Sequence, residues 1–108
     1  MKVEQFLNRN QFHLYDDETD ILQSYNSKVV EIIYRGAHQY IILGCDWDYS
    51  TTTSKHVYAF LDMYSRVKIY GVTNKRKYIN DLLKECKENR EKFLQEHNYI
   101  IVYDEEMV

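Results

Sequence analysis

The chain has 108 residues, 44% of them hydrophobic and 29% charged, with a formal net charge of −3. This apolar content excludes intrinsic disorder and predicts one domain spanning residues 1–108. No run approaches the roughly 20 apolar residues of a membrane span, and the start MKVEQFLNRNQ lacks the apolar core of a secretory signal, so we expect a cytoplasmic protein.

The first 26 residues carry weak secondary-structure signals. VEQFLN is compatible with a short helix, and residues 11–15 (QFHLY) with a short strand. The acidic run at residues 16–20 (DDETD) is typical of an exposed loop or of a first helical turn, where carboxylates meet free backbone N–H groups. If ILQSYN continues that turn, the segment is a short helix.

Residues 29–43 predict a β-hairpin. Residues 29–34 (VVEIIY) and the apolar run that ends at residue 43 are rich in β-branched and aromatic side chains, and they flank the glycine-containing loop RGAH. Both segments are apolar on both faces, which favours central positions in a sheet.

Residues 56–64 (HVYAFLDMY) fit two structures. Val57, Phe60 and Leu61 have helical spacing, whereas the aromatic and β-branched composition favours a strand. We expect a strand that forms a hairpin with residues 66–72 (RVKIYGV), although no glycine or asparagine stands at the intervening turn. Strand propensity would also account for Tyr34, Tyr40, Tyr58 and Tyr70, four of the 11 tyrosines.

The strongest signal is an amphipathic helix over residues 75–97. Asn74 is a good N-cap, an apolar stripe recurs at helical spacing, and Asn98 can end the helix. Residues 99–103 (YIIVY) predict a last strand, followed by an acidic tail. The order predicts an α+β domain: a largely antiparallel sheet of four to five strands, with one long helix on one face and a possible parallel crossover.

The stretch GCDWDYSTTTSKH (residues 44–56) is the first candidate site. An extended conformation would turn Trp47 and Tyr49 to one side and Asp46 and Asp48 to the other. This pattern indicates a strand that runs into a surface loop, with an exposed Trp or Tyr as the functional part.

Metal and catalytic sites have weaker support. A zinc site would draw on His38, Cys45, Asp46, Asp48 and His56, but the spacing matches no known zinc motif, and no glycine-rich phosphate loop accompanies the two aspartates. Cys86 is expected in the core, and His97 near a helix C-terminus. We therefore expect no catalytic residues, metal or cofactor, and keep a small zinc-binding protein as the second alternative.

A basic segment supports the first alternative, a nucleic-acid-binding protein. Cations at residues 75–77 oppose the positive end of the predicted helix, so an anion could compensate them. Tyrosines are interleaved with these cations, as in surfaces that bind single strands, although a solvated face is equally compatible. The residues of this candidate anion or nucleic-acid site are Arg66, Lys68, Lys75, Arg76 and Lys77.

Acidic clusters support the function that we expect first. Carboxylates gather near residues 16–20, in the loop 46–48 and in the tail 104–106, where they serve solubility or, if they converge, contact a basic protein surface. The predicted function is a non-enzymatic protein-binding module of unknown oligomeric state without a membrane partner. Its predicted partner-binding residues are Asp16, Asp17, Glu18, Asp20, Asp46, Trp47, Asp48 and Tyr49.

The composition also suggests a biological setting. The lack of proline and runs such as NSKVVEIIY and KECKENREKF resemble small proteins of AT-rich Gram-positive bacteria and their phages. This is a likeness of composition without a shared motif. It implies an inhibitor encoded by a phage or mobile element, of the kind represented by anti-CRISPR proteins.

Overall fold

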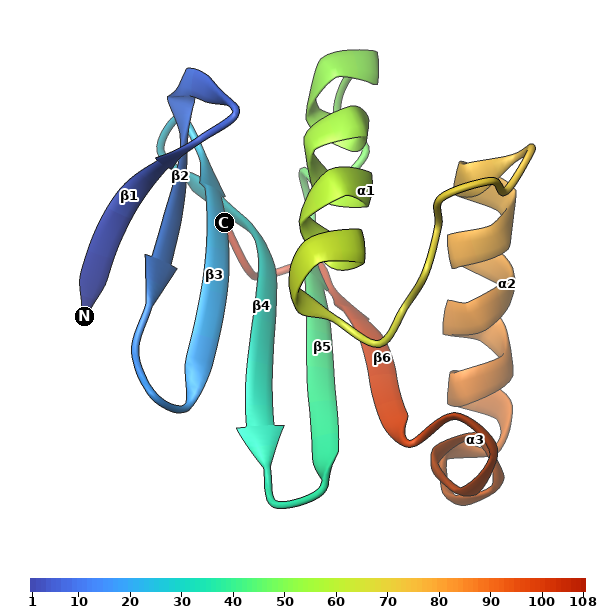
Figure 1. Ribbon diagram of the computed structural model, residues 1–108. Helices are drawn as coiled ribbons and strands as arrows, with labels where there is room; N and C mark the ends of the chain where they lie inside the picture. The colour runs from blue at the N-terminus through green and yellow to red at the C-terminus, as the bar shows by residue number, and fades with distance from the viewer.

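The first 44 residues alternate short apolar segments with tight turns, and in the computed structural model of residues 1–108 they form five consecutive strands (Figure 1). Each strand pairs antiparallel with the next one, because the connections between them are too short for anything but hairpins. The strands are β1 (Lys2–Phe6), β2 (Asn8–Tyr15), β3 (Thr19–Ser24), β4 (Ser27–Arg35) and β5 (His38–Gly44).

A sixth strand, β6 (Tyr99–Asp104), completes the sheet in the order β1-β2-β3-β4-β5-β6. β6 runs parallel to β5, and a parallel neighbour needs a long crossover. Three helices supply that crossover: α1 (Thr51–Tyr64), α2 (Lys75–Glu88) and α3 (Arg90–His97). None of the three has the length and apolar character that a membrane crossing requires.

The α+β class and the mostly antiparallel sheet are confirmed, as are the hairpin of β4 and β5 and the last strand. The count of four to five strands was wrong, because two more strands form near the N-terminus. Residues 2–6 form the edge strand β1 instead of a helix, and residues 19–24 form β3. In both segments pairing with a neighbouring strand overrides weak helical preference.

The expected strand at residues 56–64 was also wrong, because this segment lies in α1. Ser50 caps the helix by accepting a hydrogen bond from the Thr53 N–H, and the buried positions have helical spacing. The segment 66–72 that was to pair with it forms an irregular connection. Tyr34 and Tyr40 lie in strands as expected, whereas Tyr58 lies in α1 and Tyr70 is exposed in that connection.

The single helix expected over residues 75–97 is two helices. Asn89, with φ −153° and ψ 86°, leaves the helical region between α2 and α3. Its backbone N–H donates to the Glu85 carbonyl, and its side chain accepts from the Lys92 N–H, so one residue ends α2 and begins α3.

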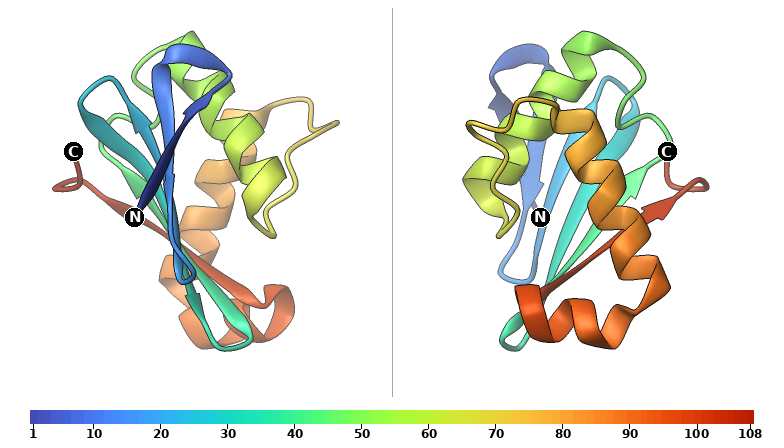
Figure 2. Two further views of the ribbon diagram at one scale, coloured as in Figure 1. Left: turned by 60° about the vertical axis from the view of Figure 1, so that its left-hand side comes forward. Right: turned by 90° about the vertical axis from the view of Figure 1, so that its right-hand side faces the viewer.

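All three helices lie on one face of the sheet (Figure 2). On that face Ile32, Ile41 and Ile101 are paired across three strands, and all three are fully buried. The largest core side chains from the helices are Phe60 on α1 and Phe93 on α3. At about 1.5–3 kcal/mol for each fully buried side chain, this layer is the main source of stability. The opposite face carries half-buried side chains such as Ile42 and Val102.

Candidate functional site: an acidic end and a polar pocket

The ends of β5 and β6 bring two acidic segments together. Parallel pairing aligns Gly44 with Asp104, and the Cys45 N–H donates to the Met107 carbonyl at 3.1 Å. The loop after β5 and the tail after β6 therefore meet at one end of the sheet. We call the surface formed by their carboxylates the acidic end; it comprises Asp46, Asp48, Asp104, Glu105 and Glu106.

Gly44 allows this close approach. A Cβ atom at this position would lie 2.5 Å from the Lys28 carbonyl oxygen and 2.8 Å from the Met107 carbonyl oxygen, both of them backbone atoms. Only glycine leaves room for the tail to pack against the end of β5.

Two groups beside the acidic end, Tyr103 and Cys45, have raised pKa values. Partial desolvation raises the pKa of the Tyr103 phenol, and the charges of nearby carboxylates, Glu105 and Asp48 among them, raise it further. Desolvation and then the charge of Asp46 raise the pKa of the Cys45 thiol in the same way. Both groups therefore stay neutral at neutral pH.

The predicted contact residues in the loop between β5 and α1 differ in their exposure to solvent. Tyr49 is 81% exposed, as expected. Trp47 is only 2% exposed and belongs to the core, so its assignment as a partner-binding residue was wrong. The indole is the largest apolar side chain of the loop, and burying it anchors the loop. Asp48 forms a salt bridge with Arg76 at 2.8 Å.

The other acidic cluster lies at the opposite end of the sheet. Asp16, Asp17 and Glu18 form the exposed turn between β2 and β3, and the Glu18 carbonyl accepts from the Tyr34 N–H near the end of β4. β5 begins at that end and runs about 20 Å before it reaches the acidic end. The acidic residues thus form two separate surfaces and do not converge on one face.

Asp20 belongs to neither surface, because it lies in a hydrogen-bonded network on the helix side of the sheet. His13 is 3% exposed and contacts Asp20 through Nε2 at 2.6 Å and Glu4 through Nδ1 at 3.2 Å. The Tyr34 hydroxyl donates to the second Asp20 oxygen at 2.6 Å, and burial and this carboxylate raise the pKa of Tyr34.

The basic residues proposed for an anion site are engaged within the molecule. The Arg66 guanidinium donates to the carbonyls of Ala37 and Asn98 at 2.7 and 2.6 Å. The ammonium groups of Lys68 and Lys75 donate to nearby backbone carbonyls. Arg76 and Lys77 form salt bridges with Asp48 and Asp81.

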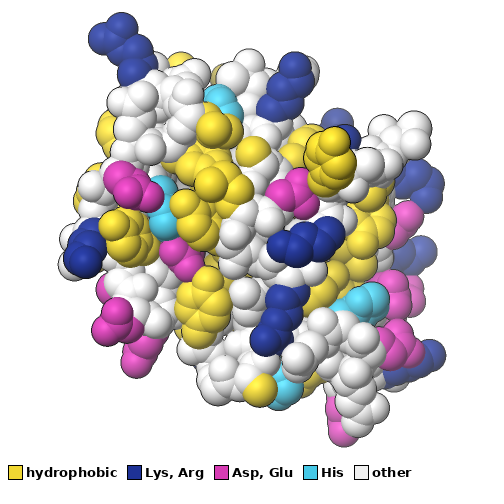
Figure 3. All heavy atoms as spheres, in the orientation of Figure 1, with side chains coloured by type: hydrophobic (Ala, Val, Ile, Leu, Met, Phe, Trp, Pro, Cys, Tyr) yellow, Lys and Arg dark blue, Asp and Glu magenta, His cyan; other side chains and the backbone are white.

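The basic side chains do not form a continuous stripe. On the face drawn in Figure 3 they are scattered, with acidic side chains between them. A nucleic-acid backbone would have to compete with the carbonyl and carboxylate partners that these cations already have. The geometry therefore favours a structural role for this segment.

The residues considered for zinc are not brought together. His38 begins β5 and Cys45 follows its end, while His56 is a buried residue of α1. Ligands of one zinc ion must converge within a few ångströms, which these positions do not allow. The group of such side chains whose ligand atoms do lie within 4.8 Å of one another is on α2 and α3, and consists of Glu85, Glu96 and His97.

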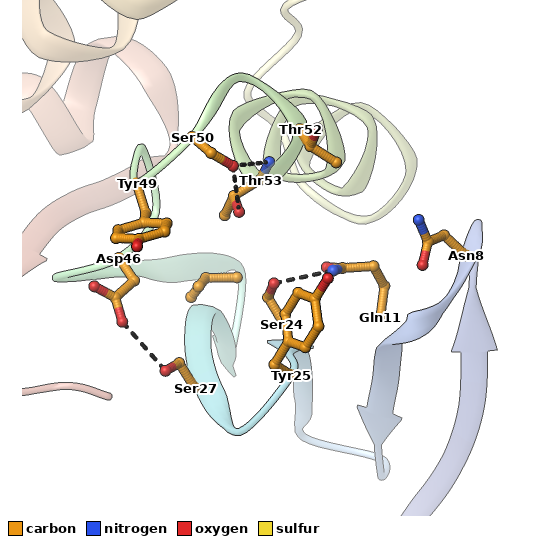
Figure 4. A pocket seen from close by; sticks show the side chains of 11 residues that line it. Asn8, Gln11, Ser24, Tyr25, Ser27, Asp46, Tyr49, Ser50, Thr52 and Thr53 are labelled. Atoms are coloured by element: carbon orange, nitrogen blue, oxygen red, sulfur yellow. Dashed lines mark hydrogen bonds between the residues drawn. The ribbon is translucent and has the colours of Figure 1, made fainter.

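A polar pocket of about 460 Å³ lies beside the acidic end (Figure 4). Four segments form it: the start of β2, the turn from β3 to β4, the loop after β5 and the first turn of α1. Apart from Val29 and the rings of two tyrosines, its lining consists of hydroxyl, amide and carboxylate groups. The polar lining residues are Asn8, Gln11, Ser24, Ser27, Asp46, Ser50, Thr52 and Thr53, and the two tyrosines are Tyr25 and Tyr49.

Hydrogen bonds hold much of this lining in place. Ser27 donates to an Asp46 carboxylate oxygen at 3.2 Å, and the Gln11 amide nitrogen donates to the Ser24 hydroxyl at 3.0 Å. The Ser50 hydroxyl donates to the Thr53 hydroxyl at 3.1 Å while it caps α1. Of the predicted site residues, the pocket contains Asp46 and Tyr49.

The sequence prediction missed the rest of the pocket. Gln11 lies on β2, where alternation places it on the same side as His13, and nothing in the local pattern marks a buried amide. Tyr25 stands in a two-residue turn and has a positive φ of 54°, which is uncommon for a residue other than glycine. The run of hydroxyl residues in GCDWDYSTTTSKH was the available signal, because it forms both the helix cap and one wall.

The fold and these surfaces define a class of protein: a small α+β domain with an open sheet, helices on one face, and a polar pocket next to an acidic end. Residues 1–80 match the family model described as "Family of unknown function (DUF8033)", and the chain belongs to this family. The match includes every residue of the pocket but not the acidic tail. No curated protein and no solved structure matches the chain.

Proposed function

We propose that the protein is a non-enzymatic binding module that docks onto a basic surface of a protein partner through the acidic end and its neighbouring tyrosines. The observation that carries this proposal is the convergence of the acidic segments 46–48 and 104–106. They are far apart in the sequence, and the parallel pairing of β5 and β6 places them side by side.

The charge of the acidic end is largely free to act on a partner. Its single salt bridge joins Asp48 to Arg76, and the other four carboxylates form none. Charges of one sign at the rim of an interface speed the encounter with an oppositely charged surface. This favours a partner that presents lysine and arginine residues.

Tyrosines supply the apolar part of the proposed interface. Tyr49 is 81% exposed and Tyr103 is 49% exposed, and both lie next to carboxylates of the acidic end. Tyrosine is enriched at the centres of protein interfaces because its ring buries a large apolar area while the hydroxyl keeps a polar contact.

The arrangement offers little support for catalysis. His13, the histidine with carboxylates on both ring nitrogens, does not line the polar pocket. In the polar pocket the Ser27 hydroxyl donates to the Asp46 carboxylate at 3.2 Å, but no histidine or lysine lines the pocket to act as the base that activates a serine. The composition of the chain resembles that of small proteins of AT-rich Gram-positive bacteria and their phages. We therefore also propose that the partner belongs to a complex that a phage or mobile element inhibits.

Two variants with the same change in net charge test the proposal. The first neutralises the tail (Asp104→Asn, Glu105→Gln, Glu106→Gln), and the matched control neutralises the opposite turn (Asp16→Asn, Asp17→Asn, Glu18→Gln). Proteins captured from a lysate of the source cells at low salt are identified for the natural chain and for both variants. We expect one specific partner that the natural chain and the control retain and that the tail variant loses.

Association and dissociation rates with that partner then distinguish long-range electrostatic attraction from direct contacts in the interface. We expect the tail variant to slow association about tenfold or more at low salt, with a smaller difference as added salt screens the charges. Tyr49→Ser should mainly speed dissociation. Equal losses in the tail variant and its control, or no specific partner at low salt, would rule out the assignment to the acidic end.

A further inference from the structure

The polar pocket has an unsatisfied hydrogen-bonding group at its wall. Gln11 is 2% exposed, and its side-chain oxygen Oε1 has no hydrogen-bond partner. The nitrogen of the same amide donates to the Ser24 hydroxyl at 3.0 Å, which leaves Oε1 as the free acceptor of this side chain (Figure 4). A buried polar atom without a partner costs roughly 1–3 kcal/mol, which a ligand that reaches it would recover.

The first turn of α1 adds backbone donors to the same pocket. Ser50 satisfies the Thr53 N–H, and the Ser54 N–H bonds to the Ser50 carbonyl. The first N–H groups of a helix generally have no intrahelical acceptor, and one of them belongs to Thr52, which lines the pocket. The pocket therefore presents acceptors and donors together.

The charge of the lining favours a neutral ligand. Asp46 is the one acidic residue of the lining, and no lysine, arginine or histidine contributes. An anion at the helix N-terminus would be repelled by the Asp46 carboxylate. A cation would have only one charged partner, the Asp46 carboxylate, which already accepts a hydrogen bond from Ser27. The other groups of the lining are neutral. Hydroxyl groups suit this lining best, because each of them can donate to Gln11 or Asp46 and accept from the helix.

Two tyrosine rings complete the pocket. Tyr25 and Tyr49 are 64% and 81% exposed, and they approach the pocket from the β3–β4 turn and from the loop after β5 (Figure 4). The backbone of Tyr25 is held at its positive φ by a bond from its N–H to the Asn10 carbonyl at 2.8 Å. Exposed aromatic faces next to hydroxyl and amide groups match a ligand with an apolar C–H face and a polar edge.

We propose that this pocket binds a neutral, polyhydroxylated ligand: a saccharide unit, free or at the end of a glycan. The hydroxyls of such a ligand bond to Gln11, Asp46 and the first turn of α1, while the C–H face of its ring lies on Tyr25 or Tyr49. A volume of about 460 Å³ is within the range of small-molecule sites. The proposal does not depend on the protein-binding function, although Asp46 and Tyr49 lie in both surfaces.

Titration of the ¹⁵N-labelled full chain with a panel of sugars tests the proposal by NMR. The neutral probes are glucose, galactose, mannose and N-acetylglucosamine, and the charged ones are glucose 6-phosphate, glucuronate and glucosamine. We expect at least one neutral sugar to shift the backbone signals of residues 8–11, 24–27 and 46–53, and to bind more tightly than its charged counterparts.

Variants then test the assigned contacts. Gln11→Met keeps the shape of the side chain without its amide, and we expect it to weaken binding about tenfold. Tyr25→Ser should weaken binding similarly, whereas Tyr103→Ser, which lies outside the pocket, should leave it unchanged. If Gln11→Met does not fold, the exposed Asn8→Ala and Thr52→Val serve instead, each with an expected loss of several-fold.

Several outcomes would overturn the proposal. They are no localised shifts with any neutral sugar at high millimolar concentration, shifts spread over the whole surface, tighter binding of a charged sugar, or unchanged affinity in every pocket variant. Gln11→Met and Tyr25→Ser should still capture the protein partner, and the tail variant should still bind the sugar. Failure of one proposal is thus distinguishable from failure of the other.

Discussion

At the scale of single residues, Gly44 allows the backbones of β4 and of the tail to pack closely against the end of β5. A methyl group there would overlap two carbonyl oxygens that belong to β4 and to the tail, and neither is the flexible end of a side chain. We predict that Gly44→Ala lowers the free energy of unfolding by about 3 kcal/mol, as overpacking against fixed atoms does. Urea denaturation followed by circular dichroism measures the change.

Gly36 provides the matched control for this substitution. A Cβ at Gly36 meets no atom within 4 Å, but its φ is +63°, so Gly36→Ala introduces backbone strain without a clash. Its expected cost is about 1–2 kcal/mol. If Gly44→Ala is no more destabilising than Gly36→Ala, the tail does not pack on β5 as described.

His56 makes the stability of the fold depend on pH. It is 9% exposed on α1, its Nδ1 has no hydrogen-bond partner, and burial lowers its pKa. In the unfolded chain the pKa is about 6.5, so below that pH the unfolded state binds the proton more readily. The contribution of neutral His56 is therefore complete above about pH 6.5 and is lost as the pH falls toward the lower folded-state pKa.

The prediction is that the free energy of unfolding falls more steeply between pH 7 and pH 5 in the natural chain than in His56→Gln, by up to about 1 kcal/mol per pH unit. Chemical denaturation at a series of pH values measures both slopes. His38→Gln is the control, because it makes the same substitution at an exposed histidine. Parallel curves for His56→Gln and the natural chain would contradict the role of burial.

At the scale of elements, Asn89 decides that the C-terminal helical region is two helices. The Asn89 side chain accepts a hydrogen bond from the Lys92 N–H, which would otherwise have no partner in the first turn of α3. We predict that Asn89→Ala lowers the free energy of unfolding by about 1 kcal/mol, or the melting temperature by roughly 4–8 °C. Thermal melting monitored by circular dichroism is the measurement. Asn89→Asp keeps the cap and should melt near the natural chain, so equal losses in both variants would argue against capping.

The elements that were predicted correctly have clear local patterns in the sequence. The hairpin of β4 and β5 combines β-branched strands with a glycine turn, and β6 follows a helix with a clear end. Residues 56–64 of α1 were mistaken for a strand because their aromatic and β-branched composition favours a strand, and because two of the five buried positions of the helix, Thr53 and His56, are polar. Counting these residues as core positions restores an unbroken helical pattern with Val57, Phe60 and Leu61, but only tertiary packing reveals their burial.

At the scale of the whole molecule, the site was only partly predictable. The acidic segments 46–48 and 104–106 could be found by inspection, but their meeting depends on the parallel pairing of β5 and β6. The same topology sends the acidic turn at residues 16–18 to the far end of the sheet. The pocket depends on residues from four segments, of which Gln11 and Tyr25 carry no local signature of function.

Arg66 connects three parts of the fold that are distant in sequence. It follows α1, and its guanidinium donates to the carbonyl of Ala37 in the β4–β5 turn and to that of Asn98 between α3 and β6. Both acceptors are backbone atoms at short distances, so each bond is charge-assisted and specific in geometry. One side chain thus ties the middle of the crossover between β5 and β6 to the end of the crossover, at Asn98, and to the turn before β5, at Ala37.

We predict that Arg66→Ala lowers the free energy of unfolding by about 1–2 kcal/mol, a value reduced for the partial exposure of the side chain. Arg9→Ala removes the same charge from an exposed position on β2 and should change stability by less than about 0.5 kcal/mol. Urea denaturation measures both. Because the other basic residues of this segment also have partners within the molecule, we expect oligonucleotides to bind neither the natural chain nor the variant at low salt. A mobility shift that Arg66→Ala abolishes without loss of stability would return this residue to an anion-binding role.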